Sequence, residues 1–248
     1  AYTIESKYIL IKNVEKKKAV EALNDIRGKI VNENGEPVSG LTITIKGTDR
    51  KLNNVEHSVI PDRIVAGTYL VAAGITGGDL YLKSVSAEHI TSIVSYLRET
   101  GCRINIKRNN IHISGPSKPR AIDIIRTLPY PGFPTDMQPQ VLTLMCVAEG
   151  TSVITETVFE NRFKHAEELQ RMGANIKIEG RTAVVKGVPN LYGALVEASN
   201  LRSGAALTLA GMAAEGESVV HGVCHIDRGY ERLEEKLQCL GAIISREE

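Results

Sequence analysis

A short polar residue stands ahead of each of three apolar stretches in this sequence of 248 residues, namely Asp62, Asp136 and Asn200. Each lies at a similar distance from the glycine that ends its stretch. Asp and Asn favour the N-cap of a helix, where the side chain accepts hydrogen bonds from unpaired N–H groups. A carboxylate among helix N-termini can also accept a hydrogen bond or a proton from a hydroxyl group. Both roles, cap and chemistry, stay open for these residues.

Arginine occupies a second recurring place. Arg162 and Arg228 stand at equivalent distances beyond the second and third apolar stretches, where the first copy has Ile90. Arg202 and Arg63 lie at the beginning of apolar stretches and extend the same polar rim. Because arginine grips phosphate or carboxylate through two parallel hydrogen bonds, these residues predict an anion-binding rim.

Structural alternatives remain open for this rim. Arg162 and Arg228 could form ordinary salt bridges with the nearby Glu160 and Glu231. His225 could be a surface histidine rather than a general acid. Residue type and spacing do not decide between these roles.

The polar positions recur because the chain repeats itself. Residues 59–125, 126–190 and 191–248 each contain an apolar helix, a glycine, a short strand, an amphipathic helix and another strand. Gly101, Gly173 and Gly241 end the amphipathic helices in the same register and fit left-handed C-cap positions. Gly28 lies in that register too, so residues 1–58 are predicted to be a partial repeat, with the chain beginning inside it.

The two helices of each repeat differ in kind. The stretches "YLVAAGI", "VLTLMCVA" and "ALTLAGMAA" are apolar all round, which is typical of interior helices. The second helices carry one apolar stripe instead, formed by Ile90, Ile93, Val94 and Leu97 in the first copy and by Leu233, Leu237 and Leu240 in the third. We therefore expect an α/β domain in which three buried central helices are covered by strands and amphipathic helices.

Composition excludes several classes of function. Thirty basic residues balance 29 acidic ones, Trp is absent, and the only lysine run, 16–18, fits a solvated helix face, so nucleic-acid binding is not expected. The four cysteines form no C-x-x-C pair, and each is expected to be buried and reduced. Neither a signal peptide nor a membrane span is apparent. We expect a cytoplasmic protein without metal or cofactor.

Several long strings carry a family resemblance. "VIPDRIVAGTYLVAA", "PYPGFPTDMQPQ", "GTSVITETVFENRFKHAEELQRMGA", "LRSGAALTLAGMAAEG" and "HIDRGYERLEEKLQCLGA" resemble the UDP-N-acetylglucosamine enolpyruvyl transferases of peptidoglycan synthesis. The resemblance is nearly continuous from Val59 to Glu248 and weaker from Lys7 to Ser58. It implies two domains of three βαβαββ repeats each, in an inside-out α/β barrel with the helices inside.

The resemblance also implies a reaction and its residues. The enolpyruvyl group of phosphoenolpyruvate moves to the 3′-hydroxyl of UDP-N-acetylglucosamine through a tetrahedral adduct, and phosphate leaves. Asp136 would meet that hydroxyl as general base, and Val158 would contact the nucleotide sugar through its backbone. Arg228 would grip phosphoenolpyruvate and the departing phosphate, with Arg202 on the same rim. Asn200 departs from the acid that is usual in the family.

The resemblance finally implies what lies outside this sequence. Most of the family's first domain is absent, together with its lysine–asparagine pair and the glycine-rich lid that bears a reactive cysteine. Residues 59–248 would form the second domain and need the first domain, or a complementing chain, for turnover. Three alternatives stay open, namely a non-catalytic binding or regulatory module, enolpyruvyl transfer to shikimate 3-phosphate, and pairing of exposed edges into a homo-oligomer.

Overall fold

The structure, a computed structural model, describes residues 3–5, 8–10 and 56–247. The chain divides into two compact units, Ala1–Val59 and Ile60–Glu248. In the first unit, β1 (Thr3–Glu5) and β2 (Tyr8–Leu10) pair in antiparallel fashion. The predicted partial repeat, with Gly28 and the lysine run 16–18, falls mainly outside the described residues.

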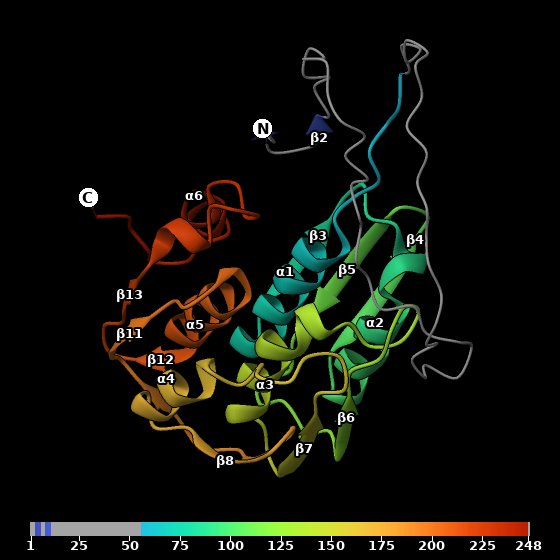
Figure 1. Cartoon of the computed structure of the whole chain (residues 1–248). Coiled ribbons are helices and arrows are strands. Elements are labelled where there is room, and N and C mark those ends of the chain that lie inside the picture. The colour runs from blue at the N-terminus through green and yellow to red at the C-terminus, as the bar shows by residue number, and fades with distance from the viewer. Residues whose placement is uncertain (1–2, 6–7, 11–55, 248) are drawn as a thin grey trace, which may run out of the picture. The chain divides into compact units, whose positions relative to one another are not determined.

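The middle repeat of the second unit has the complete order of elements that the resemblance implies (Figure 1). Its order βαβαββ is made by β6 (Ile124–Arg126), α3 (Gln138–Cys146), β7 (Thr151–Thr155), α4 (His165–Arg171), β8 (Asn175–Glu179) and β9 (Thr182–Lys186). A short 3₁₀ turn, η2 (Thr135–Met137), runs directly into α3. β8 and β9 pair in antiparallel fashion as a hairpin at the end of the repeat.

The flanking repeats depart from this order in the described part of the chain: the first has no strand before its first helix, and the third has two strands before each of its α-helices and none after the last. The first comprises α1 (Arg63–Thr76), β3 (Asp79–Leu82), η1 (Ala87–Ile90), α2 (Thr91–Glu99), β4 (Arg103–Lys107) and β5 (Asn110–Ser114). The third comprises β10 (Leu191–Tyr192), β11 (Leu195–Glu197), α5 (Leu201–Ala213), β12 (Ala214–Glu215), β13 (Val219–His221), η3 (Val223–His225) and α6 (Leu233–Cys239). Residues 56–62 form no strand before α1, and residues 240–247 form no hairpin after α6.

The sheets pair strands from within single repeats. The first repeat forms an antiparallel sheet in the order β3-β5-β4, and the second forms a mixed sheet in the order β6-β7-β9-β8. β6 and β7 are parallel, with Ile125 opposite Ile154, and β11 and β13 are parallel too. A helix crosses between the strands of each of these pairs, as parallel pairing requires.

The first helices of the three repeats, α1, α3 and α5, pack against one another in the core (Figure 1). Every residue of α3 is buried, and Leu70, Leu142 and Leu207 are fully enclosed. Gly67 in α1 faces the Met137 sulfur so closely that an added Cβ would lie 2.9 Å from it. This contact holds the start of α3 against α1 and confirms the prediction of buried central helices.

The amphipathic stripes are confirmed except at one residue. Ile90, Ile93, Val94 and Leu97 are all buried, and so are Leu233 and Leu237. Leu240 is 55% exposed, so its assignment to the stripe was wrong. The reason is that α6 ends at Cys239, before the helix completes another turn.

The glycine predictions are mostly confirmed. Gly101, Gly173 and Gly241 adopt positive φ of 98°, 92° and 98°. After α1, however, the left-handed C-cap with φ 68° is Gly77, one residue before Gly78, which is the glycine that the repeat spacing assigns to the end of the first apolar stretch.

The expectation that all four cysteines are buried is wrong for two of them. Cys102 and Cys146 are buried, while Cys224 and Cys239 are exposed, and all four are free thiols. The exposed pair lies in short helical segments near the chain end, which present one side to solvent. Among the described residues, no group of side chains suited to a metal ion occurs, and no helix is long and apolar enough to cross a membrane.

Candidate active site

Two of the three polar residues ahead of the central helices are N-caps. The Asp62 carboxylate accepts hydrogen bonds from the N–H groups of Ile64 and Val65 at 2.7 and 3.0 Å. The Asn200 amide oxygen accepts from the N–H groups of Arg202 and Ser203, both at 3.0 Å. In return, the Asn200 N–H donates to the Ser203 hydroxyl at 3.0 Å, which completes a capping box. Both side chains are thereby committed to their helices.

Asp136 is not a cap, so that part of its expected role is corrected. It lies in η2, and α3 begins after Met137 without any side-chain cap. The N–H groups of Met137 and Gln138 donate to the carbonyls of Pro134 and Thr135, while the following Pro139 has no N–H. Because the 3₁₀ turn and the proline leave few donors unpaired, the carboxylate is free for other partners.

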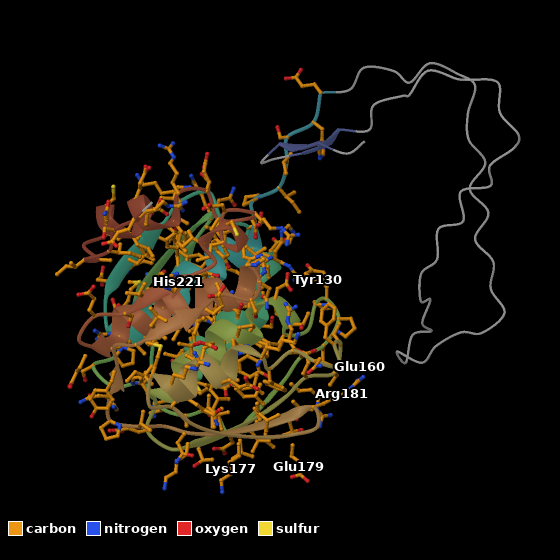
Figure 2. All side chains as sticks on the ribbon, turned by 60° about the vertical axis from the view of Figure 1, so that its left-hand side comes forward. Tyr130, Glu160, Lys177, Glu179, Arg181 and His221 are labelled. Atoms are coloured by element: carbon orange, nitrogen blue, oxygen red, sulfur yellow. The ribbon has the colours of Figure 1, made fainter. Side chains whose placement is uncertain are left out.

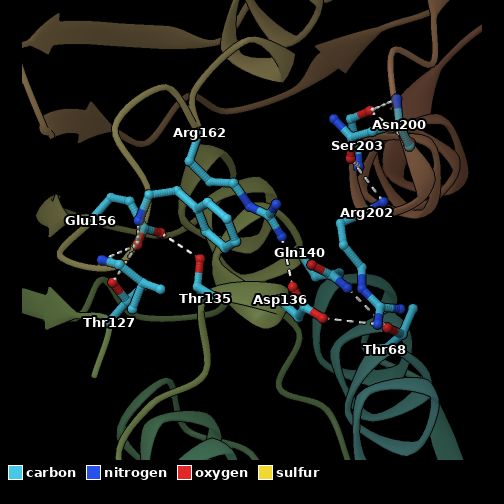
Figure 3. Close-up of polar contacts among 12 residues, drawn as sticks. Thr68, Thr127, Thr135, Asp136, Gln140, Glu156, Arg162, Asn200, Arg202 and Ser203 are labelled. Atoms are coloured by element: carbon cyan, nitrogen blue, oxygen red, sulfur yellow. Dashed lines mark hydrogen bonds and ion pairs between the residues drawn. The ribbon is translucent and has the colours of Figure 1, made fainter. Parts of the chain in front are cut away.

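Those partners are two arginines from different repeats. Arg162 Nη2 lies 2.7 Å from Asp136 Oδ1, and Arg202 Nη2 lies 3.0 Å from Asp136 Oδ2 (Figure 3). The carboxylate side chain is 38% exposed, whereas the Arg162 and Arg202 side chains are 19% and 13% exposed. A carboxylate has about four acceptor positions, so two remain for a ligand.

The alternative partner of Arg162 is excluded by this geometry. Glu160 pairs with Arg181 at 3.1 Å on the surface (Figure 2). The Arg162 guanidinium packs over the Phe159 ring at 4.8 Å, and its Nε–H is buried without a partner among the described residues. Burial, followed by the Arg162 charge, lowers the pKa of the buried His165 to about 4. The arginine is therefore held from two sides, and its buried Nε–H has no partner among the described residues.

Arg202 belongs to a second, buried network. Its Nη1 lies 3.4 Å from the Tyr230 hydroxyl, which is 2.9 Å from Thr68 Oγ1. Gln140 Nε2 donates to Thr68 and Tyr230 at 3.1 and 3.3 Å. Although burial opposes it, Tyr230 and Asp136 raise the pKa of the Arg202 guanidinium. Tyr230, Thr68 and Gln140 were not predicted from the sequence, where only Gln140, a polar residue in an apolar helix, gives a signal.

These contacts bring the beginnings of the three central helices together. Asp136 precedes α3 and pairs with Arg202 in the first turn of α5, while Gln140 joins α3 to α1. Helix N-termini carry a partial positive charge, so their convergence favours anions. The arrangement combines a hydrogen-bond-accepting carboxylate with two guanidinium groups, as expected for a site that binds an anion beside a hydroxyl.

The remaining predicted site residues lie outside this ion-paired group. Arg228 is exposed and makes no hydrogen bond or ion pair with any described residue. It lies two residues before Tyr230, which contacts Arg202 in the buried network. Val158 is 45% exposed and donates its N–H to Glu156 Oε1 at 2.8 Å. Arg63 packs over the Tyr130 ring at 5.0 Å. Glu156 was not predicted from the sequence, because the apolar pattern around it does not reveal it.

Comparisons with known sequences agree on one family. The sequence model for EPSP synthase (3-phosphoshikimate 1-carboxyvinyltransferase) matches residues 2–237. UDP-N-acetylglucosamine 1-carboxyvinyltransferase 2 of Caldanaerobacter subterraneus subsp. tengcongensis is 48% identical over 249 residues, which cover 99% of this chain and 58% of the relative. UDP-N-acetylglucosamine 1-carboxyvinyltransferase 1 of Symbiobacterium thermophilum is 54% identical over 218 residues, covering 87% and 49%. The chain spans about half the length of the curated relatives it matches.

Solved structures show the same fold. The enolpyruvyl transferase NikO from Streptomyces tendae superposes with a TM-score of 0.67 and 28% identity, over 74% of this chain and 44% of that one. EPSP synthase from Acinetobacter baumannii gives a TM-score of 0.61 with 20% identity, over 77% and 48%. The second likeness concerns the fold alone.

Proposed function

Because the chain belongs to the EPSP synthase family of carboxyvinyltransferases, we propose that it forms part of an enolpyruvyl transferase site. The proposed reaction moves the enolpyruvyl group of phosphoenolpyruvate to the 3′-hydroxyl of UDP-N-acetylglucosamine and releases phosphate. The acceptor follows from relatives at 48–54% identity, which are named for that nucleotide sugar. Transfer to shikimate 3-phosphate is the lesser candidate, since the EPSP synthase structure is only 20% identical.

One observation carries this proposal, namely the Asp136 carboxylate held between Arg162 and Arg202. Its two free acceptor positions suit a sugar hydroxyl, whose proton Asp136 would take as the oxygen attacks. The attack forms a carbon–oxygen bond at C2 of phosphoenolpyruvate while a proton adds to C3, which gives a tetrahedral adduct. Loss of one proton from the resulting C3 methyl group, as the bond between C2 and the phosphate oxygen breaks, then restores the double bond and releases phosphate.

The arginines provide the electrostatic part of this chemistry. Arg162 and Arg202 are already paired with Asp136, so they would contact the carboxylate or phosphate of phosphoenolpyruvate through their remaining N–H groups. Arg228 is exposed and free of described partners, so it can turn to the departing phosphate. Fixed donors aimed at developing negative charge are the largest expected source of rate.

The finer assignments belong to the same proposal. Val158 would contact the nucleotide sugar through its backbone, and Asp62 and Asn200 would contribute by fixing the beginnings of α1 and α5 beside the site. We place the reaction in the cytoplasm, in peptidoglycan synthesis and hence in cell-wall growth and division. The three repeats would form an inside-out barrel around α1, α3 and α5. A further domain, or a complementing chain, would complete the site.

A second candidate is a non-catalytic binding module. Asn200 favours it, because an amide cannot take a proton and its oxygen is fully used as a helix cap. Such a module would bind the nucleotide sugar at Asp136 without turnover.

A combined binding and turnover assay separates these candidates. Calorimetry with UDP-N-acetylglucosamine tests binding, and inorganic phosphate is then measured after addition of phosphoenolpyruvate. We expect binding, with phosphate and enolpyruvyl nucleotide sugar formed in equal amounts once the site is complete. Binding that never leads to phosphate release, even with a complementing domain added, would favour the module. Phosphate release from phosphoenolpyruvate with shikimate 3-phosphate as the acceptor, and none with UDP-N-acetylglucosamine, would refute the proposed acceptor.

A further inference from the structure

Glu156 is a buried carboxylate that the proposed chemistry does not use. It is 1% exposed and accepts four hydrogen bonds. Its Oε1 accepts from the Thr127 hydroxyl at 2.8 Å and from the N–H groups of Val158 and Phe159 at 2.8 and 3.1 Å. Its Oε2 accepts from the Thr135 hydroxyl at 2.8 Å (Figure 3). Backbone and hydroxyl dipoles, rather than an arginine or lysine among the described residues, compensate its charge.

A carboxylate is suited to this place because every contact it makes is a donor. Burying a charge is costly unless hydrogen bonds replace water, and here both oxygens are engaged. Among side chains of this size, only an ionised carboxylate accepts hydrogen bonds at both terminal atoms. The NH₂ group of a glutamine would instead place a donor against one of the donors that Glu156 meets. The Thr127 hydroxyl is itself fixed, since it also accepts from the Thr157 N–H at 2.8 Å.

The four bonds tie together the two segments that carry the Asp136–Arg162 pair. Thr135 directly precedes Asp136 in η2. On the other side, Phe159 lies under the Arg162 guanidinium, so the loop that Glu156 holds supports that arginine. Figure 3 shows the Glu156 cluster beside the ion-paired group, with Thr135 next to Asp136.

We propose that Glu156 is a positioning residue, which sets the placement of Asp136 against Arg162 through Thr135 on one side and the loop at 158–159 on the other. The proposal rests on the proposed function, because this placement affects substrate only if Asp136 and Arg162 contact it. Misplacement of a reacting group by about 1 Å can cost about 100-fold in rate.

The decisive variant is Thr135→Val, which removes one hydroxyl and keeps the side-chain shape. Glu156→Gln is the second variant, because it can keep the three donors to Oε1 and alter only the bond to Thr135. Thr155→Val is the matched control, since Thr155 precedes Glu156 and its hydroxyl meets only Thr182, at 3.3 Å. The first two variants should move the same atoms, and the control should not.

Two measurements decide the question. The NMR signals of the Asp136 amide and of the buried Arg162 Nε–H report placement without substrate. If the wild-type protein converts substrate, kcat reports how that placement affects the rate of the reaction. We expect both signals to move and kcat to fall about 10- to 100-fold in Thr135→Val. The melting temperature should fall by less than about 4 °C, as expected for one lost hydrogen bond.

The outcomes separate this inference from the proposed function. Unmoved signals in Thr135→Val and Glu156→Gln, or equal changes in Thr155→Val, would show that Glu156 is merely structural. If the signals move in these two variants, but the wild-type protein neither binds UDP-N-acetylglucosamine nor releases phosphate, the positioning role is upheld and the proposed function is rejected.

Discussion

The second and third repeats carry matching residue types at matching places and use them differently. Each has a short polar residue ahead of its buried helix and an arginine ahead of its outer helix. In the second repeat, Asp136 and Arg162 meet at 2.7 Å. In the third, Asn200 caps α5 and Arg228 stays exposed without a described partner. Repeat equivalence therefore gives the position of a residue in the chain but not its role.

The local turn explains the difference. Asn200 precedes a helix whose first N–H groups have no other acceptor, so its side chain is bound to them. Asp136 lies in a 3₁₀ turn followed by Pro139, where carbonyls and the missing N–H leave little to cap. The third repeat still contributes to the site, but through Arg202, in the first turn of α5.

The change Asp136→Asn gives the second repeat the residue type of the third and should have the largest effect. The amide cannot accept the hydroxyl proton, so we expect phosphate release to slow about 10²- to 10⁴-fold. Loss of the two arginine contacts should cost about 1–2 kcal/mol of stability, which is too little to explain that rate. Steady-state kinetics and urea unfolding measure the two effects.

The matched control for this change is Asp123→Asn. Asp123 is exposed and its carboxylate makes no hydrogen bond or ion pair with the described residues, so rate and stability should both stay at the wild-type values. If Asp136→Asn unfolds at the assay temperature, or loses no more rate than Asp123→Asn, Asp136 is a structural residue only.

A pH titration of stability tests the buried His165, which lies beside Arg162 in the second repeat. Burial and Arg162 hold the pKa of His165 at about 4, whereas the unfolded chain binds this proton near pH 6.5. Stability should therefore be complete above pH 6.5 and decline by up to about 3 kcal/mol as pH falls toward 4. His165→Leu should lose that part of the decline, while the exposed His221→Leu should retain it. Equal slopes in urea unfolding for both variants would contradict the assignment.

The arginines of the two repeats should differ before any ligand is added. Arg162→Lys loses the short bond to Asp136 and the contact with Phe159, so we expect about 1–3 kcal/mol lower stability. Arg228→Lys should change stability by less than about 0.5 kcal/mol, because that side chain is exposed and makes no hydrogen bond or ion pair with the described residues. Both should weaken phosphoenolpyruvate binding in calorimetry. Comparable unfolding curves for the two variants would remove the distinction between the repeats.

The repeats and their buried helices could be predicted because their causes are local. Apolar residues all round a segment lead to burial, as in α3, and a glycine after a helix supplies a positive φ, as at Gly173. The prediction for Leu240 was wrong because the end of α6 depends on the turn at Gly241. Periodicity predicts a stripe but does not say where the helix stops.

The candidate site was predictable in its residue types but not in its pairing. Arg162 has Glu160 two residues away and selects Asp136 instead, 26 residues distant. Arg202 and Asp136 are 66 residues apart, and Gln140 reaches Tyr230 across 90. Glu156 shows no signal at all, because its four donors come together only when β7, η2 and the following loop have folded. Such partners depend on the tertiary fold.

The reverse change, Asn200→Asp, should have the smallest effect and tests the comparison from its other side. The new carboxylate can accept the same two N–H bonds, and its charge at the start of α5 should add about 0.3–1 kcal/mol of stability. Asn200→Ala, which removes both bonds, should instead cost about 1 kcal/mol. If the residue served mainly as a cap, the two variants would move the urea midpoint in opposite directions. If Asn200→Asp destabilised the protein as much as Asn200→Ala, the new carboxylate would have left the cap for another partner, as the Asp136 carboxylate does. Positions 136 and 200 would then differ because of their residue types rather than because of the turns around them.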